Sequence, residues 1–338
     1  MAGEKFNLKI NHYGPYLKDK IIYNININDF NCGFFATHRK LLEYLYFADI
    51  CGYIPVIQYG NSFLYAEDHK INGTSNPYEY YFRQPSIQVK DVKKCHNVIL
   101  SDSMHSDMVS LILNGKYGVY DASLFYINQM ARISRKYVKQ NSIVDSYISN
   151  ELGRLIGEEK ILGVHVRGSD FKCNYHIHPV YVETGTYLEE TRKQFDKGNW
   201  DRVFLATDDE DALEVFRKEF GSSLLYYGDV YRTGSNKSVA FSSSEREDHH
   251  YKLGLEVLRD VYTLASCGGL ISGISQVSLC ARIIHKDKTK KEYEYLNCIH
   301  NGINLKGRHF REHTRKQKNV SENLKDAVRH LLRSPGIR

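Results

Sequence analysis

Three short segments of this sequence carry side chains suited to binding a nucleotide or another anion. The first is GVHVRGSD (163–170), in which an apolar run that begins at Ile161 reaches His165 and Arg167. Residues two apart on a strand point to the same face, so these two side chains lie together at the end of the strand. An arginine there can hold a phosphate with its guanidinium fork, or it can pair with Asp170 and close the strand end.

The second segment, VFLATDDEDALEVF, runs from a strand into a helix. The strand is expected to end at Ala206, and Thr207 with Glu210 predicts a capping box at the start of the helix. Asp208 and Asp209 suit the positive end of the helix dipole. These residues have a clear structural role whatever else they do.

Two further patterns raise the question of a metal ion. Asp209 and Asp211 form the D-x-D triplet with which metal-dependent sugar transferases hold a nucleotide diphosphate through a divalent cation. Within the first turn of a helix, however, the two carboxylates diverge. His176 and His178 share a strand face but lack a third spaced ligand. We therefore expect no metal at either place.

The third segment, HYKLGLEVLRDVYTLASCGGLISGISQVSLCARII (250–284), buries an acid and then opens a helix. Asp260 lies on the apolar stripe of its helix, which comprises Leu253, Val257, Val261 and Leu264. A carboxylate there is costly unless it is paired. Its partner could be an arginine, a helix end, or a ligand with adjacent N–H donors, such as the N1–H and N2 amino edge of guanine. Beyond the next strand, Ser275 and Gln276 begin a helix whose free N–H groups suit a phosphate.

Alternating strands and helices position these segments. In the second half the pattern predicts strands at 161–166, 202–206, 223–227 and 269–272, and helices at 185–196, 209–219, 249–266 and 275–285. That alternation is typical of a Rossmann-like domain, in which ligands bind at the carboxyl ends of the strands. In the first half we expect strands at 20–30, 53–60 and 97–102, a helix at 35–50 with parallel pairing across it, and a helical bridge at 127–158.

Composition bounds the class of protein. The chain has 338 residues, of which 42% are hydrophobic and 25% charged, and this length suits two domains. It contains no apolar run long enough to cross a membrane, and its start lacks the core of a signal peptide. Seven cysteines without a CxxC pair predict reduced thiols in a cytoplasmic protein.

The net charge of +6 belongs to one end of the chain. Residues 306–338 hold ten Lys or Arg and three acidic residues, so the rest is close to neutral. This distribution argues against nucleic-acid binding. The segment SENLKDAVRHLLRS predicts a basic amphipathic helix, which either docks on the body of the protein or rests peripherally on an anionic membrane.

In their order along the chain, GVHVRGSD, VFLATDD and LRDVYTLASCGGLISGISQVS resemble the three donor-site motifs of one superfamily. It comprises α1,6-fucosyltransferases, nodulation fucosyltransferases and protein O-fucosyltransferases. NCGFFATHRKLLEYLYFADICGYIPVI also resembles its Gly-rich loop and first helix, which places Gly33 and Phe34 at the donor. The resemblance covers roughly residues 30–50 and 160–285.

The resemblance implies an α/β GT-B fold, in which two Rossmann-like domains face each other across a cleft. We expect an N-terminal acceptor domain at 1–150, a donor domain at 151–305, and a basic tail at 306–338. The implied activity is inverting, metal-independent transfer of L-fucose from GDP-L-fucose to a glycan acceptor of surface polysaccharide or glycoconjugate synthesis, without a cofactor. The alternatives are another GDP-sugar as donor, or a non-catalytic protein that binds a glycan or nucleotide.

The motifs also imply roles for single residues. Arg167 matches the arginine that holds the donor pyrophosphate, and His165 and Asp260 match the pair that reads guanine. Ser275 and Gln276 fall at the phosphate-binding serines. Asp208 and Asp209 match the supporting Thr-Asp-Asp motif.

Two departures affect the chemistry. The α1,6 enzymes have a second arginine where this chain has Gly168. They also carry a downstream glutamate, thought to be the general base, where this chain has Tyr175 or His176. We therefore leave the base open between Asp170, His176 and Glu183.

Overall fold

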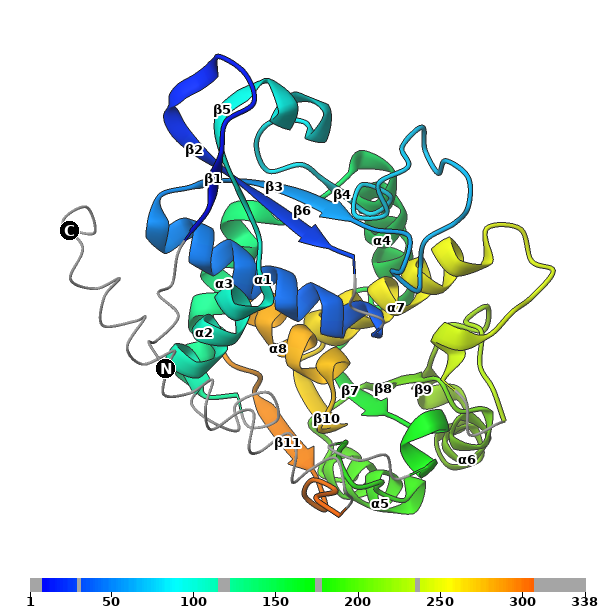
Figure 1. Cartoon of the computed structure of the whole chain (residues 1–338). Helices are drawn as coiled ribbons and strands as arrows, with labels where there is room; N and C mark the ends of the chain where they lie inside the picture. Colours follow the sequence, from blue (N-terminus) through cyan, green and yellow to red (C-terminus); the bar gives the residue numbers. More distant parts are fainter. Residues whose placement is uncertain (1–7, 29–31, 115–121, 174–177, 235–237, 307–338) are drawn as a thin grey trace.

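The structure is a computed structural model that describes residues 8–28, 32–114, 122–173, 178–234 and 238–306. Two β-sheets dominate these residues, one in each half of the chain, with helices packed between and around them (Figure 1). The basic segment predicted as a tail helix lies outside the described residues beyond Lys306. None of the described helices is both long enough and apolar enough to span a bilayer.

The first sheet has the strand order β1-β5-β2-β3. Its central strand β2 pairs in parallel with both β3 and β5, and helix α1 joins β2 to β3. The predicted parallel strand–helix–strand unit is confirmed. The elements are β1 (Ile10–Asn11), β2 (Tyr16–Ile27), α1 (Phe34–Cys51), β3 (Ile54–Tyr59) and β5 (Cys95–Leu100).

The second sheet is entirely parallel and has the order β11-β10-β7-β8-β9. Its central strands are buried on both faces, as a parallel sheet covered by helices requires. Its strands are β7 (Ile161–Val166), β8 (Arg202–Thr207), β9 (Leu224–Leu225), β10 (Gly269–Gly273) and β11 (Tyr295–Ile299). The predicted strand at 223–227 is thus real but only two residues long, and β11 was not predicted.

Helices cover both faces of this sheet. Leu162, Val164 and Val166 pack into one core on the side of α5 and α6, whereas Ile161 belongs to the core on the side of α7. Figure 1 shows α7 and α8 between the two sheets. The alternation therefore directs His165 toward α7. The helices are α5 (Thr184–Phe195), α6 (Glu210–Phe220), α7 (His249–Ser266) and α8 (Gln276–Thr289).

The predicted helical bridge at 127–158 is wrong as a single element. It consists of α3 (Leu124–Tyr137) and α4 (Ser142–Leu155), separated by β6 (Lys139–Gln140). Strand β6 pairs with β4 (Phe82–Arg83), and the side chain of Asn141 caps α4 at Val144 N. Helix α2 (Ser103–Asn114) and four short 3-10 helices were not predicted. They are η1 (Val89–Lys94), η2 (Ser169–Cys173), η3 (Gly221–Ser223) and η4 (Val239–Phe241).

A tyrosine-rich segment after β3 forms much of the core between the halves. Tyr78, Tyr80 and Tyr81 are fully buried, and the hydroxyl of Tyr81 donates to Tyr251 O at the start of α7 (3.0 Å). One hydrophobic cluster includes residues from both halves of the chain. The boundaries predicted at residues 150 and 305 remain predictions.

Candidate functional site

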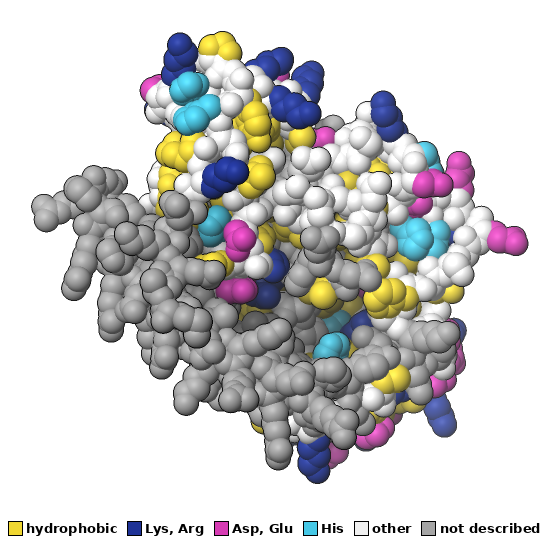
Figure 2. Space-filling view, viewed as in Figure 1, with side chains coloured by type: hydrophobic (Ala, Val, Ile, Leu, Met, Phe, Trp, Pro, Cys, Tyr) yellow, Lys and Arg dark blue, Asp and Glu magenta, His cyan; other side chains and the backbone are white. Residues whose placement is uncertain are grey.

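A cavity of about 770 Å³ lies where the two halves meet. The loop and first turn of α1 contribute to its wall from the first half. The second half contributes the carboxyl ends of β7 and β8, one face of α7 and the start of α8. In the space-filling view, histidine and Lys or Arg side chains are visible between the upper and lower parts of the molecule (Figure 2). The cavity is thus at the strand ends where α/β sheets bind ligands.

Arg167 follows β7 directly and lines this cavity. Its guanidinium group forms an ion pair with Asp208, which follows β8, and lies 3.4 Å from Ser238 Oγ. It also stacks over the ring of Phe171, 5.4 Å from the ring centroid. Asp208 accepts a further hydrogen bond from Gly168 N (3.1 Å). The sheet therefore holds one arginine in a fixed orientation at the cavity wall.

The position after Arg167 has no room for a side chain. A Cβ atom at Gly168 would overlap the carboxylate of Asp209. Asp209 is 1% exposed and caps α6 by accepting from Asp211 N (3.1 Å), while Thr207 Oγ1 accepts from Asp209 N (3.2 Å). The predicted capping box of Thr207 with Glu210 is therefore wrong, because Asp209 is the N-cap and Thr207 ends the strand.

The D-x-D carboxylates diverge as the sequence predicts. Asp209 is buried at the cap, whereas the side chain of Asp211 is 82% exposed. The ammonium group of Lys172 lies 2.5 Å from Asp209 Oδ2 and 4.0 Å from Asp211 Oδ2. A lysine already occupies the place that a bridging cation would need. Within the described ranges, no three His, Cys, Asp or Glu side chains are grouped so that they could hold a metal ion.

His165 is buried and lies against the start of α8. Its Nδ1 atom is 3.3 Å from Ser275 Oγ and 3.4 Å from Ser278 Oγ. Burial lowers the pKa of His165 to about 4, so the imidazole is neutral at pH 7. A neutral ring can offer one donor and one acceptor to a heterocyclic base.

The start of α8 faces the same cavity. Ser275 is the N-cap and accepts from Ser278 N (3.1 Å), and Ser275 and Gln276 both line the cavity. The Oε1 atom of Gln276 is buried and has no hydrogen-bond partner among the described residues. Backbone N–H groups in the first turn of a helix lack intrahelical partners, so this end of α8 suits an anion.

Asp260 is the least compensated charge in the cavity. It is 8% exposed, lines the cavity, and forms no hydrogen bond or ion pair with any described residue. Burial raises its pKa to about 7. The alternative of a pair with an arginine is not realised, because Arg259 binds Asp229 and Glu151 instead. The Asp260 side chain therefore faces the cavity without the arginine pair that the sequence allowed.

Several predicted residues are less central. Gly33 caps α1 and lines the cavity, whereas Phe34 lines it from within an aromatic cluster with Phe63 and Tyr65. Exposed Glu183 precedes α5 and does not contribute to the cavity wall.

Two of the predicted bases cannot be placed. His176 lies outside the described residues, as does the side chain of Asp170, whose backbone belongs to η2.

The sequence analysis missed several cavity residues, of which four carry charge, a ring nitrogen or an exposed aromatic ring. Arg39 enters from α1 and is paired with Glu43 (2.5 Å), which gives the first half a cation at the site. Glu256 lies one turn before Asp260, His178 was considered only as a metal ligand, and Phe241 is 62% exposed at the cavity wall. The i,i+4 spacing of Arg39 and Glu43 could have predicted an ion pair on the helix. No local pattern indicates which face of that helix packs against the other half.

No protein-family model matches this sequence, and no curated protein matches it either. Among solved structures, the chain is similar to POFUT1 in complex with GDP-fucose, with a TM-score of 0.50 and 9% identity over 84% of this chain and 99% of that chain. NodZ alpha-1,6-fucosyltransferase soaked with GDP-fucose has a TM-score of 0.46 and 16% identity, over 78% of this chain and 92% of that one. Fucosyltransferase NodZ from Bradyrhizobium gives the same figures. At such identities the likeness to the first structure establishes the fold alone, and the predicted GT-B fold is confirmed.

Proposed function

We propose that this chain is an inverting, metal-independent glycosyltransferase that transfers L-fucose from GDP-L-fucose to a glycan acceptor. The observation that carries this proposal is Asp260, a buried carboxylate without a protein partner that faces a cavity at the strand ends. Evolution rarely keeps an uncompensated buried charge in a core unless a ligand pairs with it. The N1–H and N2 amino groups of guanine are such a partner.

The other cavity groups fit the remainder of the donor. His165 offers its neutral ring beside the base, and Arg167 and the start of α8 supply positive potential for the pyrophosphate. These fixed donors would stabilise the negative charge that develops on GDP as the glycosidic bond breaks. Asp208 and Asp209 act indirectly. Asp208 pairs with Arg167 and orients it, and Asp209 fills the space next to Gly168, the residue after Arg167.

The acceptor hydroxyl must lose its proton as it attacks the anomeric carbon. We retain Asp170 and His176 as proposed bases and add His178, which lines the cavity. Replacing each by Asn or Gln separates them: loss of transfer with unchanged GDP affinity identifies the base.

We place the acceptor on the side of the first half and the enzyme in the cytoplasm. There the basic segment 306–338 would contact an anionic membrane that carries the acceptor. Sedimentation with anionic vesicles tests this location. The full chain should bind in a salt-sensitive manner, and a chain that ends at residue 305 should not.

Calorimetric titration with GDP, ADP and UDP in the presence of EDTA tests the donor site. We expect selective GDP binding without metal, and then tighter binding or turnover of GDP-fucose than of GDP-mannose. Preference for another GDP-sugar would replace GDP-fucose as the proposed donor. GDP binding without transfer to any glycan would favour the alternative of a non-catalytic binding protein. Binding of UDP only with Mn²⁺ would overturn the proposal.

The variant Asp260→Asn sharpens this test. It should weaken GDP much more than ADP, because an amide cannot accept both N–H groups of guanine. The matched control is Asp211→Asn, which removes an exposed carboxylate of the D-x-D triplet and should leave GDP affinity unchanged. Equal losses for all nucleotides in Asp260→Asn would assign Asp260 to structure.

A further inference from the structure

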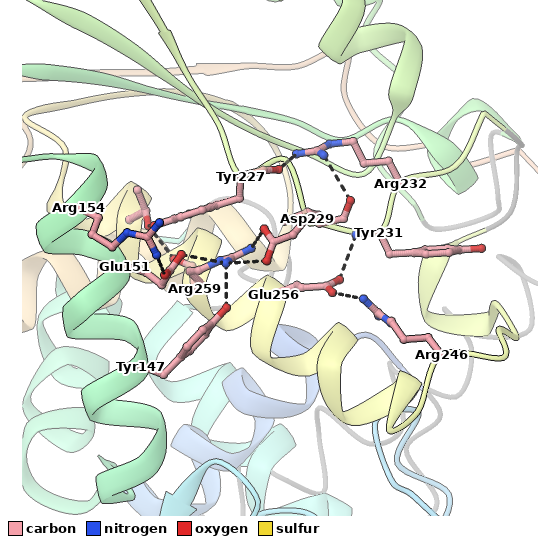
Figure 3. A network of polar contacts seen from close by, with 12 residues as sticks. Tyr147, Glu151, Arg154, Tyr227, Asp229, Tyr231, Arg232, Arg246, Glu256 and Arg259 are labelled. Atoms are coloured by element: carbon pink, nitrogen blue, oxygen red, sulfur yellow. Dashed lines mark hydrogen bonds and ion pairs between the residues drawn. The ribbon is translucent and has the colours of Figure 1, made fainter.

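We propose that Arg259, which does not touch the cavity, is a positioning residue for guanine recognition: it fixes the helix that carries Asp260 and supplies the positive charge that keeps Asp260 an acceptor. This inference rests on the proposed function, because it concerns the same nucleotide site. Figure 3 shows Arg259 at the centre of a polar network that joins three separate parts of the chain.

Arg259 is buried, and both of its terminal nitrogens are hydrogen-bonded, whereas its Nε atom has no hydrogen-bond partner among the described residues. The residue is 1% exposed, and its Nη1 atom donates to Tyr147 Oη (2.8 Å), Glu151 Oε2 (3.2 Å) and Asp229 Oδ2 (3.1 Å). Its Nη2 atom donates to Asp229 Oδ1 (2.5 Å). The guanidinium carbon also lies 3.8 Å from the centroid of the Tyr227 ring, within reach of a cation–π interaction.

These contacts fasten α7 on the side away from the cavity. Tyr147 and Glu151 belong to α4, whereas Tyr227 and Asp229 belong to the segment that follows β9 (Figure 3). Consecutive residues on a helix point about 100° apart. The clamp on Arg259 therefore fixes the rotation of α7, and with it the direction in which the next residue enters the cavity.

The segment after β9 is tied to α7 a second time. Glu256 accepts a hydrogen bond from Tyr231 N (3.1 Å) and pairs with Arg246. Val230 and Tyr231 line the cavity, so this segment forms the wall beside Asp260. Arg259 and Glu256 thus hold one wall of the cavity and its carboxylate in a single rigid unit.

Charges of both signs surround Asp260. Arg259 and Arg232 lower its pKa, Glu256 and Asp229 raise it, and burial is the largest effect, so that the pKa is about 7. Other ionisable groups on elements packed against α7 include Glu151 and Tyr147 on α4, Tyr227 after β9, neutral His165 on β7, and His285 and Lys288 on α8. A carboxylate this close to its midpoint at neutral pH responds to the loss of a single neighbour.

Two substitutions should move the pH dependence of GDP binding in opposite directions. Guanine requires the ionised carboxylate, so wild-type affinity should fall as the pH drops through the pKa of Asp260, about 7. Arg259→Met removes a favourable charge and should shift this midpoint upward, which weakens GDP about fivefold at pH 7 for a shift of one unit. Asp229→Asn removes an unfavourable charge and should shift it downward.

The experiment is calorimetric titration of the full chain with GDP between about pH 6 and about pH 8.5. Arg259→Lys keeps the charge and should restore the midpoint. Arg154→Gln is the matched control. Arg154 also pairs with Glu151 (2.9 Å), but its side chain is 80% exposed, so its loss should not shift the midpoint. Asp229 is 67% exposed, so its variant is expected to fold even if Arg259→Met does not.

The outcomes are distinguishable. Opposite shifts in Arg259→Met and Asp229→Asn, with rescue by Arg259→Lys, support the inference. If Arg259→Met does not fold, Arg259→Gln, which removes the charge but keeps N–H donors, takes its place and should also shift the midpoint upward. A wild-type midpoint that no variant moves overturns it, because Arg259 is then a structural residue only. If the wild type binds no GDP, the proposed function fails and this inference fails with it.

Discussion

At the scale of single residues, the cavity is lined by two kinds of ionisable group. Burial favours the neutral form of some of them, whereas an arginine keeps its charge. The pKa of His165 is lowered and that of Asp260 is raised, both mainly through burial. Arg167 keeps its charge because guanidinium groups do not lose their proton in proteins. The cavity wall therefore combines a neutral imidazole, a carboxyl group close to its midpoint and a guanidinium cation.

The fork geometry of Arg167 should matter more than its charge. Arg167→Lys retains the pair with Asp208 but loses bidentate contact with a pyrophosphate. We expect GDP affinity to fall by roughly tenfold to a hundredfold, the value of one or two charge-assisted hydrogen bonds. The urea midpoint should stay near that of the wild type. Equal affinity in calorimetry would remove Arg167 from the donor site.

At the scale of elements, the sequence predicts what local patterns determine. The bounds of β7 and α7 agree with the expectation to the residue, because a mostly apolar strand and a strongly amphipathic helix are local signals. The break between α3 and α4 could not be predicted, since residues 138–141 contain neither Gly nor Pro. Distant parts of the chain impose this break. Strand β6 pairs with β4, and the Asn141 side chain donates to Glu79 O and Tyr80 O.

The same distinction holds within the candidate site. His165, Arg167 and Asp260 were predictable because each breaks an apolar pattern in its own element. Arg39 and Glu256 were not, since both lie on helices whose inward faces depend on how the two halves pack. The close approach of Asp209 to Gly168 is also a long-range effect, invisible in either segment alone.

Gly254 should be the least replaceable residue of α7. A Cβ atom there would overlap the hydroxyl and ring of fully buried Tyr81. We expect Gly254→Ala to lower the free energy of unfolding by about 1–3 kcal/mol through overpacking. Gly153 of α4 is the matched control, because nothing lies within 4 Å of its added methyl group. Gly153→Ala should raise stability by about 0.5–1 kcal/mol, as alanine does in an open helix position.

Urea unfolding followed by circular dichroism measures both variants. If Gly254→Ala were as stable as Gly153→Ala, the tyrosine-rich segment would not pack on α7 as described, and the connection between the two halves would have to be sought elsewhere.

At the scale of the whole molecule, α7 connects the two halves of the chain to the cavity. Its first turn is held by the first half, where Glu67 accepts from Tyr251 N (2.8 Å) and His69 lies 2.8 Å from Asp248. Its middle carries Asp260, and its outer face is fastened by Arg259. The ionisation of Asp260 is therefore coupled to the packing of the entire fold, and the proposed binding of a nucleotide there would be coupled to it as well.

The pH dependence of global stability should report this coupling. The pKa of Asp260 is about 7 in the folded chain and near the ordinary 3.8 when unfolded, so between these values the folded state binds the extra proton. Asp260 consequently destabilises the fold most above pH 7, and this cost disappears as the pH falls. Asp260→Asn should therefore be more stable than the wild type at about pH 8, by roughly 2–4 kcal/mol, and by less than half as much at about pH 5.

The difference between the two proteins is the informative quantity. Three buried histidines, His38, His105 and His165, have pKa values lowered to about 4, and they make both proteins less stable as the pH falls below about 6.5. Because they are common to both, they cancel in the comparison, as does Glu43. Urea unfolding at several pH values gives the difference directly. A constant difference would mean that Asp260 is ionised and solvated in the free protein. A difference that shrinks as the pH falls would identify a buried carboxylate that lowers the stability of the fold, as the proposed nucleotide site predicts.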